Sequence, residues 1–408
     1  MRPGTPFFVA GKLLEAREGR GLSAAALADL VEVRRETVYQ LESGKITPGP
    51  ALFERLQIAL RMPAAFFFDP LDDREQGDLV LFRSLRSATK PARQRARWRL
   101  HWLKRITHFV EEFVDLPPFD VPDYDLQMDP LNIPTQHIEE IAEDLRRRWV
   151  LGQGPISNIT WLLENRGIIL AREDLGAEDL DAAILGIPTR VFVLLGADKG
   201  TDVRSRMDAA HELGHILLHR HCPAPTSDKD PRHKVMEQQA FRFAGAFLLP
   251  ADSFGSDVWS CTLEEFLALK PKWRVAVSAM ILRASHLGLI SEDKQRRLWQ
   301  QYSRRRWKKG EPFDAEWTPE QPVLLRRSVE LVLDAGAASV DRFLSELKLP
   351  PTDIELLAGL SPGTLSHGPS PIRFRGGAST PSAFEDNVLT FDRQPKPSSS
   401  NALDRARS

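Results

Sequence analysis

Cysteine is almost missing from this sequence, whose 408 residues contain only Cys222 and Cys261. Two cysteines are too few for a disulfide framework, so we expect a protein of the reducing cytoplasm. No hydrophobic run is long enough to cross a bilayer, and the first residues lack the pattern of a secretory signal, so we expect no membrane contact. The formal net charge of −1 provides no general attraction to nucleic acid, and any such affinity must come from local clusters.

Histidine is also scarce, with ten residues, but two of them stand four positions apart in the segment M-D-A-A-H-E-L-G-H-I-L-L-H-R at residues 207–220. His211, Glu212 and His215 form an H-E-x-x-H pattern. On a helix the two imidazoles share one face and can hold one divalent metal. Glu212 lies about 100° around the helix, so it can act as a general base toward water without ligating the metal. The alternative is an ordinary buried helix with satisfied histidines.

A metal site of this kind needs a third protein ligand and leaves one position open. Glu237 begins an apolar-periodic segment at residues 237–250, which predicts a helix that ends at Pro250. Its carboxylate can complete a His-His-Glu set. His219 continues the spacing of four and is the rival ligand, although we interpret it as a residue behind the ligands or at the helix end. A His-His-Glu set with an open position suits zinc, so the expected cofactor is Zn2+.

Residues 1–70 predict a compact group of short helices. The expected helices cover residues 7–18, 24–30, 50–60 and 64–68, together with one in the segment 34–45. Ser23 is placed to cap the second helix, and Gly44 is placed to end the third. A short helix, a tight turn and a helix that begins with polar and basic residues make a helix-turn-helix arrangement. The alternative is a helical docking module without affinity for DNA.

Residues 9–70 resemble the Xre/Cro-type repressor domain. The resemblance rests on G-L-S-x-x-x-L-A-x-L at residues 21–30 and on E-S-G-K at residues 42–45. It implies a recognition helix whose side chains face DNA at four positions: Arg34, Arg35, Thr37 and Gln40.

The same resemblance implies an ion pair between Arg17 and Glu42. Two departures from the family are visible: Ala24 stands where Gln is usual, and Glu32 stands in the turn where Gly is usual. A lost polar contact and an added negative charge both weaken contacts to DNA.

A basic stretch follows, with nine Lys or Arg residues and no acidic residue between Arg83 and Arg105. Aromatic and aliphatic residues recur in it at near-helical spacing. We interpret it as an amphipathic helix with a solvated basic side; the alternative is a phosphate-binding face with stacking aromatics. Five prolines between residues 116 and 134 indicate a linker. Residues 71–134 are therefore predicted to be a basic helix and a Pro-rich linker.

Three short strands are expected at residues 168–170, 181–185 and 190–195. The last is either an edge strand that could hold an extended peptide or part of the sheet interior. A donor for a developing oxyanion is not evident, because no tyrosine lies in the metal segments. The candidates are His219, His221, His233 and Arg283.

Residues 136–312 resemble the ImmA/IrrE family of metallopeptidases. Several pieces match in order, including G-P-I-S-N-I-x-x-L-L-E-x-x-G-I at residues 154–168, the H-E-x-x-H segment and E-Q-Q-A-F-R-F-A-G-A-F-L-L-P at residues 237–250. The resemblance implies a zincin-like domain with the zinc ligands His211, His215 and Glu237 and the general base Glu212. Phe241 stands where the family often has Asn.

The chain is thus predicted to be mainly α with a small β-sheet, an α+β fold. We expect a helix-turn-helix domain at residues 1–70 and a metallopeptidase domain at residues 135–311. A small helical cap follows at residues 312–360. Residues 361–408, rich in Ser, Pro, Gly and Arg, are expected to be disordered. A second basic cluster at residues 294–309 is interpreted as the solvated end of a helix.

These patterns predict a zinc metallo-endopeptidase of the HExxH type with a DNA-binding module. The ImmA/IrrE resemblance implies regulation of transcription, in a stress response or in mobile elements, by cleavage of a repressor or another partner protein. The expected partners are a protein substrate and DNA, and a homodimer is compatible with the sequence. The alternative is a non-enzymatic transcriptional regulator, or a toxin–antitoxin component, whose peptidase-like domain acts as a sensor or docking unit.

Overall fold

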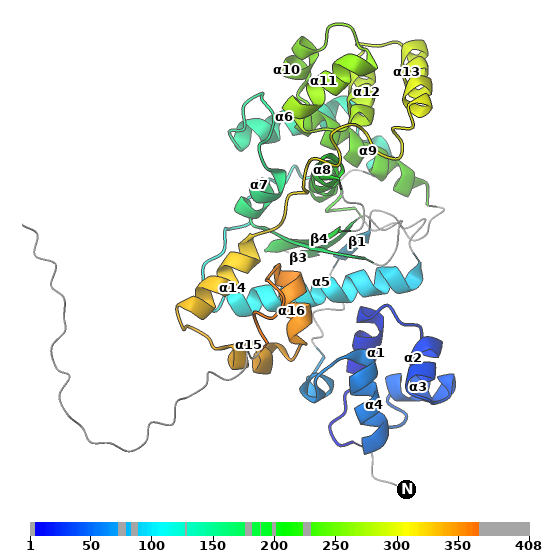
Figure 1. Ribbon diagram of the computed structural model, residues 1–408, viewed down its shortest axis with the longest axis vertical. Coiled ribbons are helices and arrows are strands. Elements are labelled where there is room, and N and C mark those ends of the chain that lie inside the picture. Colours follow the sequence, from blue (N-terminus) through cyan, green and yellow to red (C-terminus); the bar gives the residue numbers. More distant parts are fainter. Residues whose placement is uncertain are drawn as a thin grey trace, which may run out of the picture. The chain divides into compact units, whose positions relative to one another are not determined.

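The structure, a computed structural model, describes residues 5–71, 79–82, 89–126, 129–175, 182–187, 189–197, 201–222 and 230–366. Within these ranges it contains sixteen α-helices and one four-stranded sheet (Figure 1), which confirms the α+β prediction. The tail expected to be disordered lies outside the described residues from position 367 onward. Among the described helices, none is both long and apolar enough to span a bilayer.

The N-terminal part is a group of short helices: α1 (Ala10–Gly19), α2 (Ala24–Leu30), α3 (Arg35–Glu42), α4 (Pro50–Leu60) and the 3-10 helix η1 (Ala64–Phe68). Local signals define their ends. The side chain of Ser23 accepts a hydrogen bond from the amide of Ala26 at 3.0 Å, and Gly44 follows α3 with a φ of +70°. The expected ion pair is present, with 2.5 Å between Arg17 Nε and Glu42 Oε1.

The sheet has the strand order β1-β3-β4-β2, with β1 (Leu79–Phe82), β2 (Ile168–Glu173), β3 (Ala182–Ile187) and β4 (Arg190–Gly196). β3 pairs antiparallel with β1 and with β4, whereas β4 and β2 are parallel. β4 therefore has a partner on both sides, and the edge-strand alternative for residues 190–195 is wrong. Its apolar run is buried from Val191 to Leu195, because helices cover both faces of the sheet.

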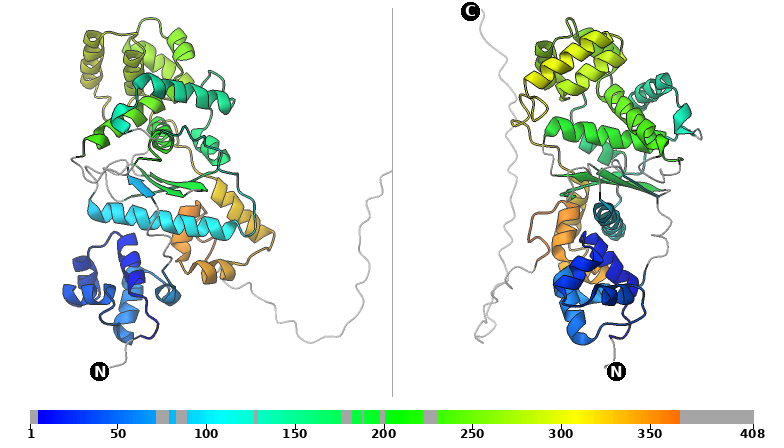
Figure 2. Two further views of the ribbon diagram at one scale, coloured as in Figure 1. Left: turned by 180° about the vertical axis from the view of Figure 1, so that it is seen from behind. Right: turned by 90° about the vertical axis from the view of Figure 1, so that its right-hand side faces the viewer.

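The two faces of the sheet pack into different cores. Phe192 and Leu194 of β4 belong to a core with α5 (Lys90–Val110), whereas Val191, Val193 and Leu195 belong to a core with α8 (Asp202–Leu218). This alternation follows from the two-residue period of a strand. Figure 2 shows α5 and α8 on opposite faces of the sheet.

Helix α5 departs from our expectation of an amphipathic helix with a solvated basic side beside a linker. It packs on β3, β4 and α1, and β1 just before it joins the sheet. Arg99 is only 2% exposed, because carboxylates from distant elements surround it: Glu173 at the end of β2 and Asp353 of α16 (Pro351–Ala358). Residues 1–367 form one compact unit, and its division at residues 70, 134 and 311 stays a prediction.

The remaining helices surround this framework. They are η3 (Pro130–Asn132), α6 (Thr135–Arg148), α7 (Ile159–Asn165), α9 (Pro231–Leu248), α10 (Ala251–Asp257), α11 (Leu263–Trp273), α12 (Val277–His286), α13 (Glu292–Arg304), α14 (Leu324–Asp334) and α15 (Val340–Leu347). Helices α14, α15 and α16 all pack on α5. The C-terminal helices and the N-terminal helices thus share one central helix.

Candidate metal centre

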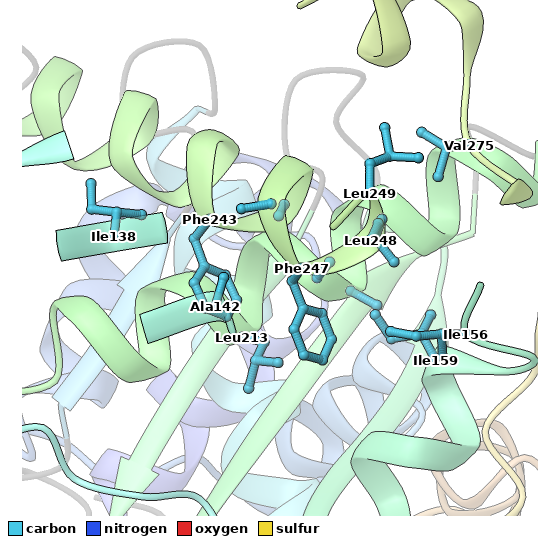
Figure 3. Close-up of a cluster of buried hydrophobic side chains, with 14 of the residues drawn as sticks. Ile138, Ala142, Ile156, Ile159, Leu213, Phe243, Phe247, Leu248, Leu249 and Val275 are labelled. Atoms are coloured by element: carbon cyan, nitrogen blue, oxygen red, sulfur yellow. The ribbon is translucent and has the colours of Figure 1, made fainter. Parts of the chain in front are cut away.

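Helices α8 and α9 carry the residues predicted to bind a metal, and they lie directly against each other. The closest approach is at Gly214, where an added Cβ would lie 3.1 Å from the Cα of Ala240. Leu213 of α8 and Phe243 and Phe247 of α9 share one apolar core (Figure 3). The absence of a side chain at Gly214 therefore allows the two helices to approach closely. Helix α9 begins at Pro231, earlier than the expected start at Glu237, so Glu237 stands in its second turn, beside the histidines of α8.

Three side chains converge between these helices. The Nε2 atoms of His211 and His215 lie 3.0 Å apart. The carboxylate of Glu237 lies 3.5 Å from Nε2 of His211 and 3.3 Å from Nε2 of His215. Together they form a group that could hold a metal ion.

The donor set fits zinc. Tetrahedral Zn2+ with nitrogen and oxygen bonds of normal length keeps its ligand atoms about 3.3 Å apart, which is close to the spacings found here. Neutral imidazole nitrogens and a carboxylate oxygen present lone pairs to one another, and a cation between them removes that repulsion. The geometry of His211, His215 and Glu237 is therefore the one that the zinc hypothesis requires.

A chain of hydrogen bonds lies behind His215. Its Nδ1 is 3.0 Å from Nδ1 of His219, whose Nε2 is 2.9 Å from Oε1 of Gln239. The chain ends at Gln239 Nε2, which donates to the carbonyl of Pro130 at 2.6 Å. His219 is thus a partner of His215 and not one of the three converging residues.

The carbonyl of Pro130 determines which atom donates and which accepts in each hydrogen bond of this series. Since the Pro130 carbonyl can only accept, Gln239 donates to it and accepts from Nε2–H of His219. Burial and the neighbouring His215 lower the pKa of His219 to about 3, so it is neutral at pH 7 and its Nδ1 carries a lone pair. That lone pair accepts from Nδ1–H of His215. The Nε2 of His215 is then left unprotonated and faces Glu237 and His211.

Sequence reasoning missed Gln239 and Pro130. Gln239 stands two residues after Glu237 in the E-Q-Q segment, a spacing that could have drawn attention to it. Pro130 belongs to the stretch expected to be a linker, and no local pattern connects it with the histidines. The contact joins residues 109 positions apart.

The remaining candidates lie as follows. Glu212 is on α8 next to His211 and is 2% exposed. Among the oxyanion candidates, the only ring N–H of neutral His219 is donated to Gln239, and His221 is 2.8 Å from the carboxylate of Asp123. Arg283 is held by Glu139 and by the carbonyl of Leu249, and His233 lies in the first turn of α9.

The four residues predicted to face DNA lie on or beside α3. Arg34 is its N-cap residue, Arg35 and Gln40 are exposed, and Thr37 is half-buried. The hydroxyl of Tyr39, one turn on, accepts a hydrogen bond from Arg35 at 2.6 Å.

The opposite side of α3 is buried through Val38 and Leu41. In the turn before α3, Glu32 has a φ of +54°, a conformation that favours glycine, which explains why the related family has Gly there. The exposed face of α3 remains the predicted DNA-reading surface.

Comparisons with known families agree with this arrangement. Residues 163–285 match the peptidase M78 model, described as the IrrE N-terminal-like domain, and residues 13–67 match a helix-turn-helix model. The first match contains the three converging residues and Glu212, and the second contains α3. The resemblance to ImmA/IrrE proteins with an Xre-type domain is confirmed. No curated protein matches the chain significantly.

Proposed function

We propose that this chain, which joins a helix-turn-helix domain to an IrrE-like domain of the peptidase M78 family, is a zinc-dependent endopeptidase. The convergence of His211, His215 and Glu237 at spacings suited to a tetrahedral metal carries the proposal. Glu212, next to His211 on the same helix, provides a carboxylate that the ligand set does not use.

The two histidines would hold Zn2+ through their Nε2 atoms, and Glu237 through its carboxylate. The bound metal would supply a Lewis acid that polarises the scissile carbonyl and acidifies water. His219 and Gln239 keep Nδ1 of His215 protonated, so the lone pair of Nε2 stays available to the metal.

Glu212 would act as the general base and then as the general acid. Its carboxylate takes a proton from the attacking water as the new carbon–oxygen bond forms. It delivers that proton to the amine nitrogen as the carbon–nitrogen bond breaks. One side chain thus serves both steps, and the carboxylate is regenerated at the end of the cycle.

The substrate we propose is a repressor or another protein that acts at DNA. The reason is the helix-turn-helix domain in the same chain, whose α3 presents Arg34, Arg35 and Gln40 to solvent. Such side chains bind phosphates and base edges in related arrangements.

The peptidase proposal is tested by metal content and proteolysis in the wild type, Glu212→Gln and Glu237→Ala. Glu212→Gln should keep the metal and lose about 10²–10⁴-fold in proteolysis, because only the proton transfer is removed. Glu237→Ala should lose most of the metal. Equal metal content in Glu237→Ala and the wild type would remove Glu237 from the ligand set. Metal-loaded wild type without proteolysis of unfolded proteins would favour a sensor over an enzyme.

The DNA proposal is tested by gel-shift binding to promoter fragments at several salt concentrations. Arg34→Ala with Arg35→Ala should weaken binding and reduce its salt dependence. The control is Arg296→Ala with Arg297→Ala, which removes two exposed arginines from α13. No salt-dependent binding by the wild type would leave the N-terminal domain as a docking unit.

A further inference from the structure

A cavity of about 460 Å³ lies beside the metal centre, between α8, α9, α12 and α13. Its wall includes Met207 of α8, Phe241 and Gly245 of α9, Leu282 of α12 and Trp299 of α13. The volume falls in the range of about 300–1,000 Å³ that is typical of ligand pockets.

The cavity continues the line of metal ligands along both helices. Met207 precedes His211 by four residues, and Phe241 follows Glu237 by four, so each shares a helix face with a converging residue. The rings of Phe241 and His211 are in contact, with centroids 4.2 Å apart. The cavity therefore begins about one helical turn from His211 and from Glu237.

The interior suits an uncharged group. The guanidinium of Arg283 is already held by Leu249 O at 2.9 Å and by Glu139 at 2.7 Å. Burial, together with the charges of Arg242 and Arg283, lowers the pKa of His286 to about 4, so this ring is neutral at pH 7. The wall also carries Arg204 and Asp208, which are opposite in charge and stand on α8, while Met207, Phe241, Leu282 and Trp299 make its apolar part. A charged group buried against that apolar part would lose its hydration.

Asp208 also lines a second cavity, of about 310 Å³. Asp208 precedes Glu212 by four residues, so it shares the helix face of the proposed base. The two cavities thus share a lining residue on α8, about one turn before His211 and Glu212. An extended chain that crosses α8 at this point can place neighbouring side chains in both.

We propose that the 460 Å³ cavity receives a bulky, uncharged side chain, of the size of leucine, methionine or phenylalanine, from a substrate residue beside the scissile bond. This inference rests on the proposed peptidase function, because it takes the metal centre as the place of cleavage. Burial of the apolar side chain against Met207, Phe241 and Trp299 stabilises the bound substrate.

The chain offers a substitution that fills the cavity without disturbing the fold. A Cβ on Gly245 would meet only Cδ of Arg283, at 3.9 Å, so a larger side chain can grow into the cavity. Leucine is also a better helix former than glycine at such a position. The matched control is Gly255→Leu, because a Cβ on Gly255 of α10 meets nothing within 4 Å.

The first experiment measures binding without cleavage. The full chain is labelled with 5-fluorotryptophan, and the Trp299 resonance is assigned with Trp299→Phe. N-acetyl-leucinamide and N-acetyl-phenylalaninamide should shift this resonance at concentrations at least about tenfold lower than N-acetyl-alaninamide. Gly245→Leu should abolish that preference, and Gly255→Leu should keep it. Equal responses to the three amides, or an unchanged preference in Gly245→Leu, would overturn the inference.

The second experiment connects the cavity with cleavage. The zinc-loaded wild type, Gly245→Leu and Gly255→Leu act on a mixed peptide library, and cleavage sites are read by mass spectrometry. A large apolar residue should dominate one position beside the cleaved bond in the wild type and in Gly255→Leu. Gly245→Leu should shift that position at least about tenfold toward small residues.

The two experiments separate the two proposals. Amide binding at Trp299 without any cleavage would remove the peptidase function and the substrate role, and it would leave an apolar binding site. Cleavage without side-chain preference, together with no response at Trp299, would remove the role of the cavity and leave the peptidase function standing.

Discussion

The metal centre and the surroundings of α5 are both buried groups of ionisable side chains, but their charges are arranged differently. We define the junction cluster as Arg20, Arg99, Glu173 and Asp353. In it Arg99 contacts Glu173 and Asp353, each at 2.5 Å, and Asp353 also contacts Arg20 at 2.6 Å. Each cation has an anion beside it. In the candidate metal centre, by contrast, the described residues bring together two imidazoles and a carboxylate, each of which can offer a lone pair to a metal.

This difference distinguishes a buried cluster that stabilises the fold from a buried cluster that binds a ligand. The junction cluster is complete within the chain, so its effect is on the fold: it joins α1, α5, β2 and α16. We propose that the candidate metal centre takes a cation from outside the chain, so its effect would be on binding and chemistry. The predictions below test this distinction.

The largest expected effect is on the junction cluster. Arg99→Met leaves Glu173 and Asp353 buried at 1% and 5% exposure, each with one cation fewer. The free energy of unfolding should fall by about 3–5 kcal/mol, as measured by denaturant titration. Replacing Arg99, Glu173 and Asp353 together by apolar residues should cost less than the single change. A loss below about 1 kcal/mol for Arg99→Met would mean that the cluster is not the connection we describe.

Acid should weaken the same cluster, by less than Arg99→Met because Glu173 still holds Arg99. Burial alone would raise the pKa of Asp353, but Arg20 and Arg99 outweigh it and hold that pKa below the usual 3.8. The stabilising contribution is thus complete above the unfolded pKa and is lost as pH falls through the lower folded pKa. Asp353→Asn should show a smaller change in unfolding free energy between about pH 5 and pH 3 than the wild type.

Zinc should stabilise the fold through the metal centre alone. At a free concentration about 100 times its dissociation constant, zinc should raise the free energy of unfolding by about 2.7 kcal/mol, and a chelator should reverse the gain. Arg99→Met should show the same increment from its lower baseline, since the two groups share no residue. Glu237→Ala should lose most of the increment. An equal gain in Glu237→Ala and the wild type would place the metal elsewhere.

The hydrogen bonds from His215 to His219 and Gln239 predict that two similar substitutions of His219 will affect zinc binding differently. Asn carries an oxygen near the place of the imidazole Nδ1, so it can still accept from Nδ1–H of His215. Gln places its oxygen one bond farther out and loses that contact. His219→Gln should weaken zinc binding about 10–100-fold in competition with a chromogenic chelator, and His219→Asn should recover most of the loss.

The control for this comparison is His221→Asn, because His221 is exposed and pairs with Asp123. It should leave zinc binding unchanged. Equal losses in His219→Asn and His219→Gln would mean that His219 supports the site by its volume and not by its acceptor.

The smallest effect is expected at an exposed ion pair. Arg296 and Asp293 of α13 are 3.3 Å apart, with both side chains mostly in solvent. Arg296→Ala should change the unfolding free energy by no more than about 0.5 kcal/mol. A larger loss would contradict our interpretation of the basic residues at 294–309 as a solvated helix end.

Much of the N-terminal fold could be predicted from local patterns. The expected helices at residues 24–30, 50–60 and 64–68 coincide with α2, α4 and η1, because capping residues and helix ends depend on neighbours in the chain. The H-E-x-x-H helix could be predicted equally well, since the spacing of four between its histidines is a local property of the sequence. The prediction of Glu237 as the third ligand required both the periodicity of its own helix and the family resemblance.

The role of α5 could not be predicted in this way. Its arginines and aromatics have a spacing that a solvated basic helix would also show. Burial of Arg99 depends on Glu173 and Asp353, which are 74 and 254 residues away. No local pattern states that two such carboxylates will meet one guanidinium.

The amino-acid sequence by itself determined many elements of this protein and the candidate donors for a metal, because helix periodicity, caps and the spacing of His211 and His215 act over a few residues. Only the tertiary structure decided which charges became buried partners, which histidine stood behind the ligands and where an apolar cavity opened. The physical reason is that burial and hydrogen bonding are set by whatever side chains the folded chain brings together, often from more than a hundred residues apart.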